Sequence, residues 1–368
     1  MNDNRVVLLL VNHDIVIYNF RFEIVERLIQ EGYEVHISSP KGEHTQELID
    51  AGAFFHEISI KRHGMNPIEE LGLLGKYKRL ISEIKPIIVF TFTIKCNIYG
   101  GMASRSLHIP FVANVTGLGT MVNEGGWKEK MIIILYRIGL NRAQRVFFQN
   151  TANKNYFISK HVINSSYSVL PGSGVNLEKH CYELYPDERG GLVFSTIGRL
   201  MRDKGTDELI EAARKIKSKY PETTFRLIGF FDDKYETKVK KAVEEGIIQY
   251  ITQQRDIHPW ISSSHAIIHP SHHEGMSNVL LEAAATGRPV IATDISGCRE
   301  TFEDGISGIS FMPGDYRSLV NAVERFILLS RSDREKMGKA GRKKVEKEFD
   351  RNIVVNRYML ELDRINEK

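Results

Sequence analysis

The sequence predicts an α/β protein with two doubly wound parallel sheets. Short apolar segments alternate with helical ones along most of the chain, which is typical of parallel sheets covered by helices on both faces. At 368 residues the chain is too long for one ordinary core. A segment rich in glycine and proline, Tyr167 to Gly190, interrupts the alternation once. We therefore expect a first domain over residues 1–170, a second over 171–349 and a last helix over 350–368.

The expected strands are the near-continuous apolar runs, and helical segments fill the intervals between them. These runs are 5–11, 34–40, 54–60, 87–92, 111–115 and 145–149 in the first half, and 191–200, 224–229, 249–252, 265–270, 289–293 and 308–312 in the second. Because ligands bind at the carboxyl ends of parallel strands, we look for function in the loops that follow these runs.

Composition narrows the class of protein. Hydrophobic content of 42% and charged content of 26% are those of a globular protein, and no apolar run approaches the roughly 18 residues needed to span a bilayer. With no signal-peptide pattern, we expect a cytoplasmic location.

Cys96, Cys181 and Cys298 lie far apart without metal-ligand spacing, which argues against a zinc site. The net charge of +4 does not indicate nucleic-acid binding, but the basic excess lies in the first half and can orient that domain toward an anionic surface.

The stretch from His265 to Glu282 has the pattern of a buried strand, a tight polar loop and a helix. We expect the first turn of this helix to be Gly275, Met276, Ser277 and Asn278. A helix N-terminus presents unpaired N–H groups and the positive end of its dipole, so an anion such as a phosphate is its natural occupant.

Glu274 and Glu282 flank this turn. If both lay on one helix they would stand roughly 12 Å apart, about the length of a nucleotide diphosphate sugar. Each carboxylate could accept hydrogen bonds from hydroxyls. Taken alone, a pair at this spacing is more commonly a capping acid and a solvated helix residue, so the context decides between the two interpretations.

That context is the run Glu274-Gly-Met-Ser-Asn-Val-Leu-Leu-Glu282, followed by Ala-Ala-Ala-Thr-Gly-Arg-Pro-Val-Ile-Ala-Thr-Asp. It resembles the donor-site signature of the retaining, nucleotide-sugar-dependent glycosyltransferases of family 4. The resemblance implies the GT-B fold, in which two Rossmann-like domains face each other and the last helix crosses back to the first. It also implies a UDP-sugar donor, with no cofactor and no catalytic metal. In this family pattern Glu274 orients the sugar hydroxyls and Glu282 holds the ribose.

Two further loops of the second half are donor-site candidates. Gly198, Arg199 and Lys204 follow the first strand there, and the resemblance implies that both cations neutralise the leaving diphosphate. Without the downstream glutamates both could simply be solvated. Arg255 and Asp256 follow the run 249–252, where similar enzymes hold the nucleobase through backbone groups, although Asp256 could equally cap a short helix from His258. Asp232 and Asp233 are interpreted as a solvated turn and not as a metal site.

Polar residues also follow the strands of the first half, and we assign them to acceptor binding. They are His13, Asn19, Arg21, Lys95, Asn97, Thr116 and Gly117. His13 could equally be structural. These loops resemble those of N-acetylgalactosaminyltransferase-like bacterial enzymes that extend undecaprenyl-diphosphate-linked saccharides, which implies a polyprenyl-diphosphate-linked saccharide as acceptor. Many relatives carry a histidine after the strand 111–115, whereas this chain has Val115-Thr116-Gly117, so no catalytic histidine is assigned there.

The helical segment Trp127 to Arg142 carries more apolar residues than one face can bury. Met131, Ile134, Leu135 and Ile138 form one stripe, and Ile132, Ile133 and Tyr136 fall outside it. With its many lysines and arginines, this segment could lie on an anionic membrane surface or pack within the domain.

These observations lead to one functional hypothesis. We expect a retaining, metal-independent glycosyltransferase that moves a hexose or N-acetylhexosamine from a UDP-sugar to a lipid-linked saccharide, for a capsular polysaccharide or glycan, peripherally on the inner face of the cell membrane. The alternatives are a nucleotide-sugar 2-epimerase or a phosphorylase on the same scaffold, and a non-catalytic nucleotide-sugar-binding protein.

Overall fold

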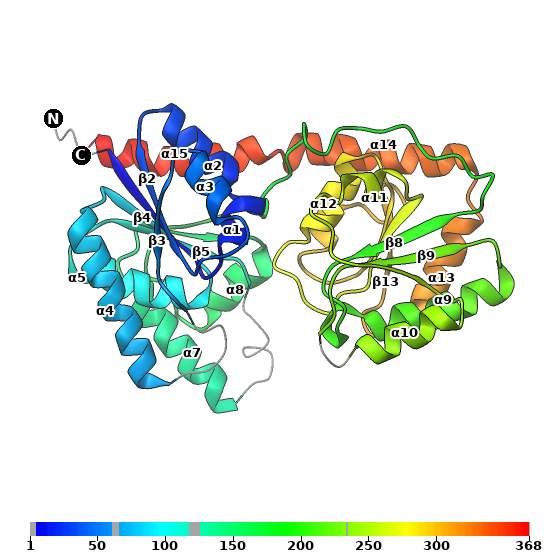
Figure 1. Ribbon diagram of the computed structural model, residues 1–368, viewed down its shortest axis with the longest axis horizontal. Helices are drawn as coiled ribbons and strands as arrows, with labels where there is room; N and C mark the ends of the chain where they lie inside the picture. Colours follow the sequence, from blue (N-terminus) through cyan, green and yellow to red (C-terminus); the bar gives the residue numbers. More distant parts are fainter. Residues whose placement is uncertain (1–4, 61–65, 118–125, 233–234, 368) are drawn as a thin grey trace. The chain divides into compact units, whose positions relative to one another are not determined.

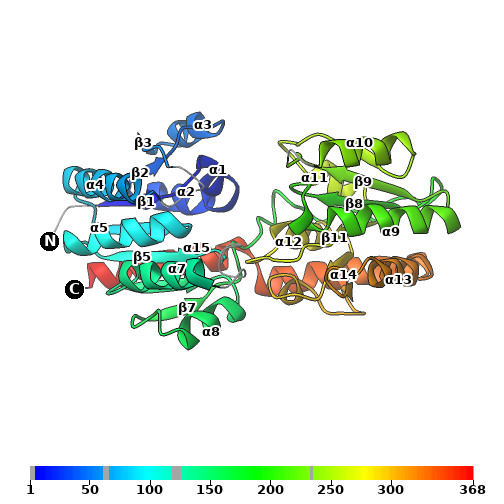
Figure 2. The ribbon, with the colours of Figure 1, turned by 90° about the horizontal axis from the view of Figure 1, so that it is seen from below.

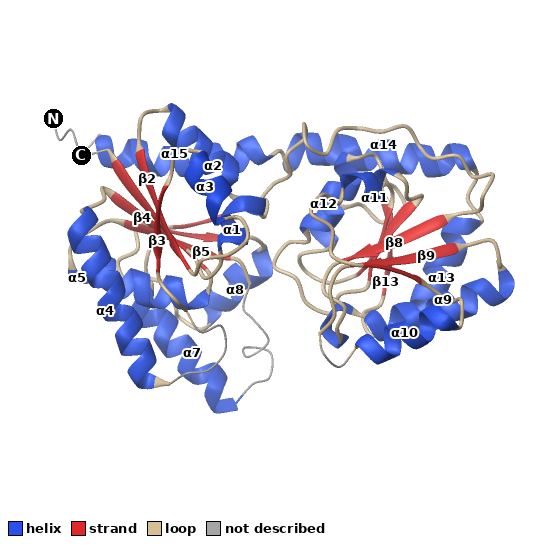
Figure 3. Ribbon diagram, viewed as in Figure 1, coloured by secondary structure: helices blue, strands red, loops and turns tan. Residues whose placement is uncertain are grey.

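The computed structural model describes residues 5–60, 66–117, 126–232 and 235–367. The chain divides into two compact units, residues 1–173 with 352–368 and residues 174–351. Each unit is built on one parallel sheet, as Figures 1 and 3 show. The predicted pair of doubly wound sheets is therefore confirmed. The first unit extends to Ser173, whereas the sequence placed its end at residue 170.

The first unit contains a seven-stranded sheet in the order β3-β2-β1-β4-β5-β6-β7. The strands are β1 Val6–Leu10, β2 Glu34–Ser39, β3 Phe54–Glu57, β4 Ile88–Phe92, β5 Phe111–Val115, β6 Arg145–Phe148 and β7 Tyr167–Val169. We had assigned Tyr167 to the inter-domain connection, but it pairs with Val146 as the start of β7, so this expectation was wrong. The reason is that an edge strand needs only one neighbour and can be short and polar.

Helices cover both faces of this sheet, as Figure 2 shows. They are α1 Asp14–Phe20, α2 Phe22–Gln30, α3 Thr45–Asp50, α4 Pro67–Ile84, α5 Gly101–Ser106, α7 Gly126–Gly139, α8 Thr151–Ser159 and α15 Arg351–Asn366, with a π-helical turn at Cys96–Gly100. Alternate residues of each buried strand point to opposite faces. Val7 and Leu9 therefore pack in a cluster with α1, α2 and α15, while Leu8 and Leu10 pack with α4, α5, α7 and α8.

The last helix, α15, completes the first unit, as the fold class predicted (Figure 1, red). Its apolar face, which includes Val355, Tyr358 and Leu362, belongs to the cluster beneath β1, β2 and β4. Glu361 adds an ion pair with Arg145 at 2.6 Å. The ring of Tyr358 lies edge-on to Phe90, with centroids 5.1 Å apart. This helix therefore joins the core and is not a surface appendage.

The second unit contains a six-stranded sheet in the order β10-β9-β8-β11-β12-β13. Its strands are β8 Val193–Ile197, β9 Thr224–Ile228, β10 Gln249–Ile251, β11 Ala266–His269, β12 Val290–Thr293 and β13 Gly308–Phe311. Its helices are α9 Thr206–Lys219, α10 Glu236–Glu244, α11 His258–Ser262, α12 Asn278–Ala285, α13 Tyr316–Ile327 and α14 Arg331–Glu348, with 3-10 turns at Arg202–Lys204 and Arg299–Thr301.

Strand order locates the place where a ligand would bind in each unit. In the second sheet the chain runs outward from β8 through β9 to β10, and then returns to β11 on the other side of β8. In the first sheet the same reversal separates β1 from β4. Ligands of open α/β sheets bind at such switch points, beyond the carboxyl ends of the strands. The predicted donor loops follow β8 and β11, and two of the predicted acceptor loops follow β1 and β4.

The buried face of α7 differs from the expected stripe. Ile132 and Tyr136 are the side chains fully buried in the core, whereas Ile134 is 52% exposed and Ile138 is 41% exposed. The predicted inner and outer faces were thus largely exchanged, because helical spacing defines stripes but the neighbouring elements decide which stripe is covered. Within the described residues, no helix combines the length and apolarity that crossing a membrane requires.

Candidate active site

The loop after β8 begins with a glycine that the backbone requires. Gly198 has φ +148°, and its carbonyl oxygen would lie 1.9 Å from a Cβ on Gly229. Side chains at these two positions would therefore strain or clash. The chain leaves the strand in this tight conformation and places the Arg199 guanidinium over the ring of Phe230, 5.3 Å from its centroid. The predicted cation thus stands at the carboxyl end of β8.

The same loop then turns toward β11. Lys204 ends a 3-10 turn, and Gly205 follows with φ +69°. A Cβ on Gly205 would lie 2.1 Å from the carbonyl oxygen of Pro270, so the two loops touch through backbone. This close approach brings the Lys204 ammonium to 2.5 Å from Glu274 Oε1. Two predicted site residues, 70 positions apart in the sequence, are joined here.

Glu274 is also held by a residue that the sequence analysis did not select. His269, the last residue of β11, has its Nε2 atom 2.8 Å from the same Glu274 oxygen. Burial alone would raise the pKa of the Glu274 carboxyl, but His269 and the charge of Lys204 outweigh it and lower the pKa to about 2. Glu274 is therefore ionised throughout the physiological range. The sequence feature that could have identified His269 is its position at the end of a strand, five residues before Glu274.

The turn after Glu274 differs from the expected one. Helix α12 begins at Asn278 with Ser277 as its N-cap, so Gly275, Met276 and Ser277 precede the helix. Ser277 donates its backbone N–H to the carbonyl of Gly297 at 2.8 Å, and a Cβ on Gly297 would lie within 3 Å of Glu274. This second loop contact holds the turn open. Because Glu274 lies outside the helix, the 12 Å estimate for its distance to Glu282, which assumed one continuous helix, does not apply.

Two buried polar atoms at this turn make no hydrogen bond within the described part of the protein. They are Ser277 Oγ, in a residue that is 3% exposed, and Asn278 Oδ1. Ser277 occupies the N-cap position, yet its hydroxyl makes no capping bond. A buried polar group without a partner costs about 1–3 kcal/mol, so such groups call for an explanation. A ligand with polar groups, seated beside Glu274 and Lys204, would satisfy both.

Glu282 lies farther along α12 in a different environment. Burial raises the pKa of its carboxyl to about 7, although the charges of Arg351 and Lys179 lower it in part. The Nε2 atom of His180 lies 3.8 Å from Glu282 Oε1. Burial, with His258 and Lys179 nearby, lowers the pKa of His180 to about 3. Near pH 6 both groups are thus mostly neutral, and they do not form an ion pair.

The two halves of the chain match known families. Residues 187–344 match the family described as "Glycosyl transferases group 1", and residues 6–150 match the one described as "Glycosyl transferase 4-like". The chain is a glycosyltransferase, with a 4-like first domain and a group 1 second domain. The enzyme has the GT-B fold, in agreement with its solved structural neighbours. Because the chain is a glycosyltransferase, the non-catalytic nucleotide-sugar-binding protein is no longer among the alternatives.

Individual relatives span nearly the whole enzyme. It is 24% identical over 366 residues to the N,N'-diacetylbacillosaminyl-diphospho-undecaprenol alpha-1,3-N-acetylgalactosaminyltransferase of Campylobacter jejuni, covering 95% of this chain and 96% of that one. It is 25% identical over 354 residues to the capsular polysaccharide biosynthesis glycosyltransferase CapM of Staphylococcus aureus, with 90% of both chains covered. The structure of Anabaena Alr3699/HepE in complex with UDP and glucose gives a TM-score of 0.78 at 18% identity, covering 97% of this chain and 98% of that one.

The remaining donor candidates of the glycosyltransferase are on the loop after β10. Arg255 and Asp256 are both exposed. Asp256 Oδ1 accepts a hydrogen bond from the backbone N–H of His258 at 3.0 Å. Asp256 therefore bonds the first residue of the short helix α11 from one position before the N-cap, Ile257, which favours the structural alternative kept open from the sequence. Asp232 is exposed, and Asp233, the other residue of the predicted solvated turn, lies outside the described residues.

The first predicted acceptor loop of the glycosyltransferase is mostly helical. We expected a helix from about Asn19, but α1 begins at Asp14, and the His13 Nδ1 atom accepts a hydrogen bond from the Ile15 N–H at 3.4 Å. Asn19 lies on this helix, half-buried. Arg21 is only 2% exposed, and its guanidinium lies 5.5 Å from the ring centroid of Phe92. Of the three predicted acceptor residues in this loop, His13 is the exposed one.

The loops after β4 and β5 likewise use their polar groups internally. Asn97 is fully buried, accepts from Thr91 Oγ1 at 2.7 Å and donates to the Asn114 carbonyl at 2.8 Å. Lys95 pairs with Glu70 at 2.5 Å. Thr116 and Gly117 are half-buried, and the rest of that predicted loop, Leu118 and Gly119, lies outside the described residues. The structure thus brings Lys204 to Glu274 at the turn before α12, leaves Glu282 and the β10 loop apart from that contact, and disperses the acceptor candidates.

Proposed function

We propose that this glycosyltransferase moves a hexose or N-acetylhexosamine from a UDP-sugar to a polyprenyl-diphosphate-linked saccharide, as a step in capsular polysaccharide or glycan synthesis. One observation carries the donor half of the proposal. An ionised glutamate, a lysine and two buried polar atoms that have no partner in the part of the chain the structure describes surround a single turn beyond the switch point of the second sheet. The Anabaena structure with UDP and glucose and the undecaprenol-dependent Campylobacter enzyme support the two substrate classes.

The donor diphosphate would be stabilised by protein groups without a catalytic metal ion. Lys204 reaches this turn from the β8 loop, which also carries Arg199, and a phosphate arriving there would share the Lys204 ammonium with Glu274. Cations and oriented donors of this kind stabilise the charge that develops on a leaving diphosphate. Backbone N–H groups near the start of α12 would add to them.

Glu274 would position the transferred sugar. With a pKa of about 2 it is a carboxylate, so it accepts hydrogen bonds from sugar hydroxyls and does not donate a proton as a general acid. His269 and Lys204 fix its orientation. We propose transfer with retention, in which a donor phosphate oxygen accepts the acceptor proton on the face from which UDP departs. Glu282, whose pKa of about 7 leaves it partly protonated at neutral pH, would bond the ribose hydroxyls.

The acceptor would be presented at the inner face of the cell membrane by helix α7. Trp127, Ile134 and Ile138 are 68%, 52% and 41% exposed, and their spacing places them with Met131 along one helical face. Lys128 and Lys130 are also exposed. Tryptophan and lysine flanking an apolar face suit the interface of an anionic bilayer.

The membrane proposal has a direct test. Wild type should pellet with anionic liposomes, and a Trp127→Ser, Ile134→Ser, Ile138→Ser variant should remain in the supernatant. The control changes Ile49, an exposed residue of α3, to Ser and should still pellet. The variant should bind UDP as wild type does, because the donor turn is in the other unit. If wild type also stays in solution, α7 does not bind membranes.

The overall function is tested by product analysis. The enzyme should be supplied with a panel of UDP-sugars, a lipid-linked saccharide acceptor and a chelator, and the products analysed by mass spectrometry and anomeric NMR. A lengthened acceptor with the donor's anomeric configuration is expected. Acceptor-independent conversion of the UDP-sugar would indicate an epimerase, and transfer that stops in the chelator would overturn metal independence.

A further inference from the structure

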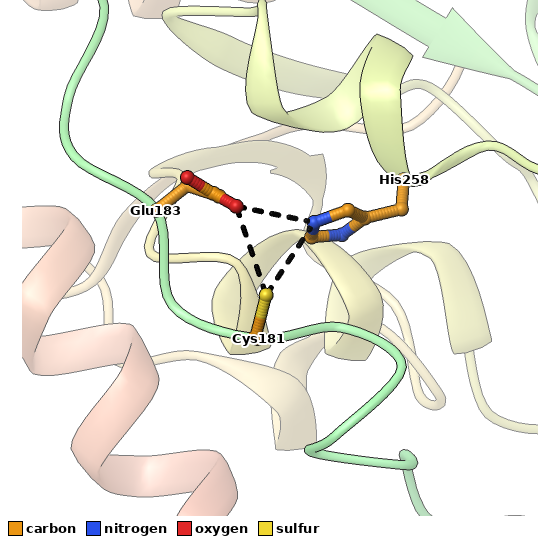
Figure 4. Close-up of side chains that lie close together, drawn as sticks. All are labelled: Cys181, Glu183 and His258. Atoms are coloured by element: carbon orange, nitrogen blue, oxygen red, sulfur yellow. Dashed lines mark hydrogen bonds and ion pairs between the residues drawn. The ribbon is translucent and has the colours of Figure 1, made fainter.

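Three side chains of the second unit converge on one point away from the donor turn. Cys181 and Glu183 belong to the extended segment that precedes β8, and His258 is the first residue of α11 (Figure 4). The Cys181 sulfur lies 3.6 Å from Glu183 Oε1 and 3.8 Å from His258 Nε2, and the latter two atoms are 3.7 Å apart. The three ligand-type atoms thus form a nearly equilateral triangle.

This triangle has the dimensions of one face of a metal coordination tetrahedron. Bond lengths of about 2.3 Å to sulfur and about 2.0–2.1 Å to nitrogen and oxygen place the ligand atoms of a tetrahedral zinc ion roughly 3.3–3.6 Å apart. The observed separations exceed these values by only a few tenths of an ångström. A cation would therefore need little side-chain movement to bind all three atoms.

The arrangement is not that of a nucleophile with a general base. In such a triad the histidine faces the nucleophile with one ring nitrogen and the carboxylate with the other. Here both the thiol and the carboxylate approach the same nitrogen, Nε2. Convergence of three ligands on one point favours a shared cation over proton transfer.

The other nitrogen of His258 has a partner of its own. Its Nδ1 atom lies 3.4 Å from Thr286 Oγ1, and that hydroxyl already donates its proton to the Glu282 carbonyl at 2.9 Å. The hydroxyl can therefore only accept from His258, which places the ring proton on Nδ1 and leaves the Nε2 lone pair free. Metal-binding histidines are commonly oriented by such an outer contact.

We propose that Cys181, Glu183 and His258 form a binding site for Zn²⁺ or a similar borderline-soft divalent cation, with a fourth position open to water. A thiolate and an imidazole select against Mg²⁺ and Ca²⁺, which prefer oxygen ligands. On binding, the cation forms one bond to each ligand atom and the Cys181 thiol releases its proton to solvent. Cys181 is exposed and the Glu183 side chain is 46% exposed, so the ion can enter from solution.

The site would join parts of the unit that are distant in sequence. It would link the segment around Cys181 to α11 and, through Thr286, to the C-terminal end of α12. Since α12 begins at the donor turn, the ion would brace the far end of the helix that carries Glu282. This role is separate from the chemistry proposed for the transferase, which uses no metal.

Cobalt substitution tests the proposal. Titrating the purified, chelator-treated enzyme with Co²⁺ should give one bound ion per chain and a thiolate-to-cobalt charge-transfer band. Cys181→Ser should abolish the band and weaken Zn²⁺ binding more than about tenfold. Thr286→Val, which removes only the outer contact, should weaken binding about 10- to 100-fold while keeping the band.

The matched control is Glu178→Gln, which changes an exposed acid on the same segment and should bind Co²⁺ as wild type does. Zn²⁺ should also raise the melting temperature of wild type but not of Cys181→Ser, since an ion that binds only the folded state stabilises it. A wild-type protein without a thiolate band, or a Cys181→Ser protein that retains it, would overturn the site. UDP binding in chelator reports on the transferase proposal independently.

Discussion

The loops beyond the two switch points contain similar residues but use them differently. In the second unit, Lys204 and Glu274 meet at a turn where Ser277 Oγ and Asn278 Oδ1 find no hydrogen-bond partner among the described residues. In the first unit, both ends of the Asn97 side-chain amide are hydrogen-bonded within the core, and Lys95 is paired with Glu70. Polar residues at strand ends can thus serve a ligand or the fold. Whether their hydrogen-bonding capacity is already filled distinguishes the two roles.

The largest effect is expected at Glu274. Glu274→Gln keeps the shape but removes the charge that accepts sugar hydroxyls and pairs with Lys204. We expect kcat to fall about 10²- to 10³-fold with a smaller change in donor KM, because the contact is to the reacting sugar. Steady-state kinetics measure this, with Glu244→Gln on α10 as an exposed control. A change confined to KM would assign Glu274 to ground-state binding.

The comparison predicts a loss of stability, and not of binding, at Asn97. Asn97→Ala leaves the Thr91 hydroxyl and the Asn114 carbonyl buried without a partner, so unfolding of the first unit should cost about 3 kcal/mol less. His13→Ala, at an exposed position, should cost less than about 1 kcal/mol and instead raise the acceptor KM. Urea unfolding and acceptor kinetics separate the two roles. If the Asn97→Ala protein is as stable as wild type but binds the acceptor weakly, Asn97 belongs to the acceptor site.

Lys204 should contribute to UDP affinity directly. Lys204→Ala removes a hydrogen bond to a charged group, and we expect UDP binding to weaken by about 1.5–3 kcal/mol in calorimetry without divalent metal. Lys215→Ala, on the exposed side of α9, is the matched control. If UDP affinity depends on Mg²⁺ or Mn²⁺ and is insensitive to Lys204, the donor-site assignment is wrong.

The smallest effect concerns the pH dependence of stability at Glu282. Its folded pKa of about 7 lies above its ordinary value of 4.5, so the stability it contributes is complete below pH 4.5 and is lost as the pH rises through 7. Between pH 6 and 8 this loss amounts to about 1.4 kcal/mol. Glu282→Gln should lack this part of the pH dependence, because an amide does not titrate. Identical pH profiles would show that Glu282 is ionised without penalty.

The sequence pointed to the candidate donor turn because Glu274 and the residues that follow it are contiguous along the chain. Glu274 to Glu282 carry a recognisable signature, and the β8 loop supplied Arg199 and Lys204. His269 was missed because a histidine at the end of a buried strand gives no signal until its partner is known. The start of α12 was misplaced because Gly275 to Ser277 are held by Gly297, which lies 20 or more residues downstream.

The sequence by itself determined the two sheets and their order of elements, and it predicted an anion-binding turn before α12. Apolar periodicity is a local property, and burial of the resulting faces requires a doubly wound arrangement. Only the tertiary structure decided which face of α7 is exposed, which strand-end amides are already bonded, and that Cys181 meets His258 across 77 residues. These outcomes depend on which neighbours the sheet brings together. Burial and electrostatic partners are properties of that packing, and no spacing along the chain encodes them.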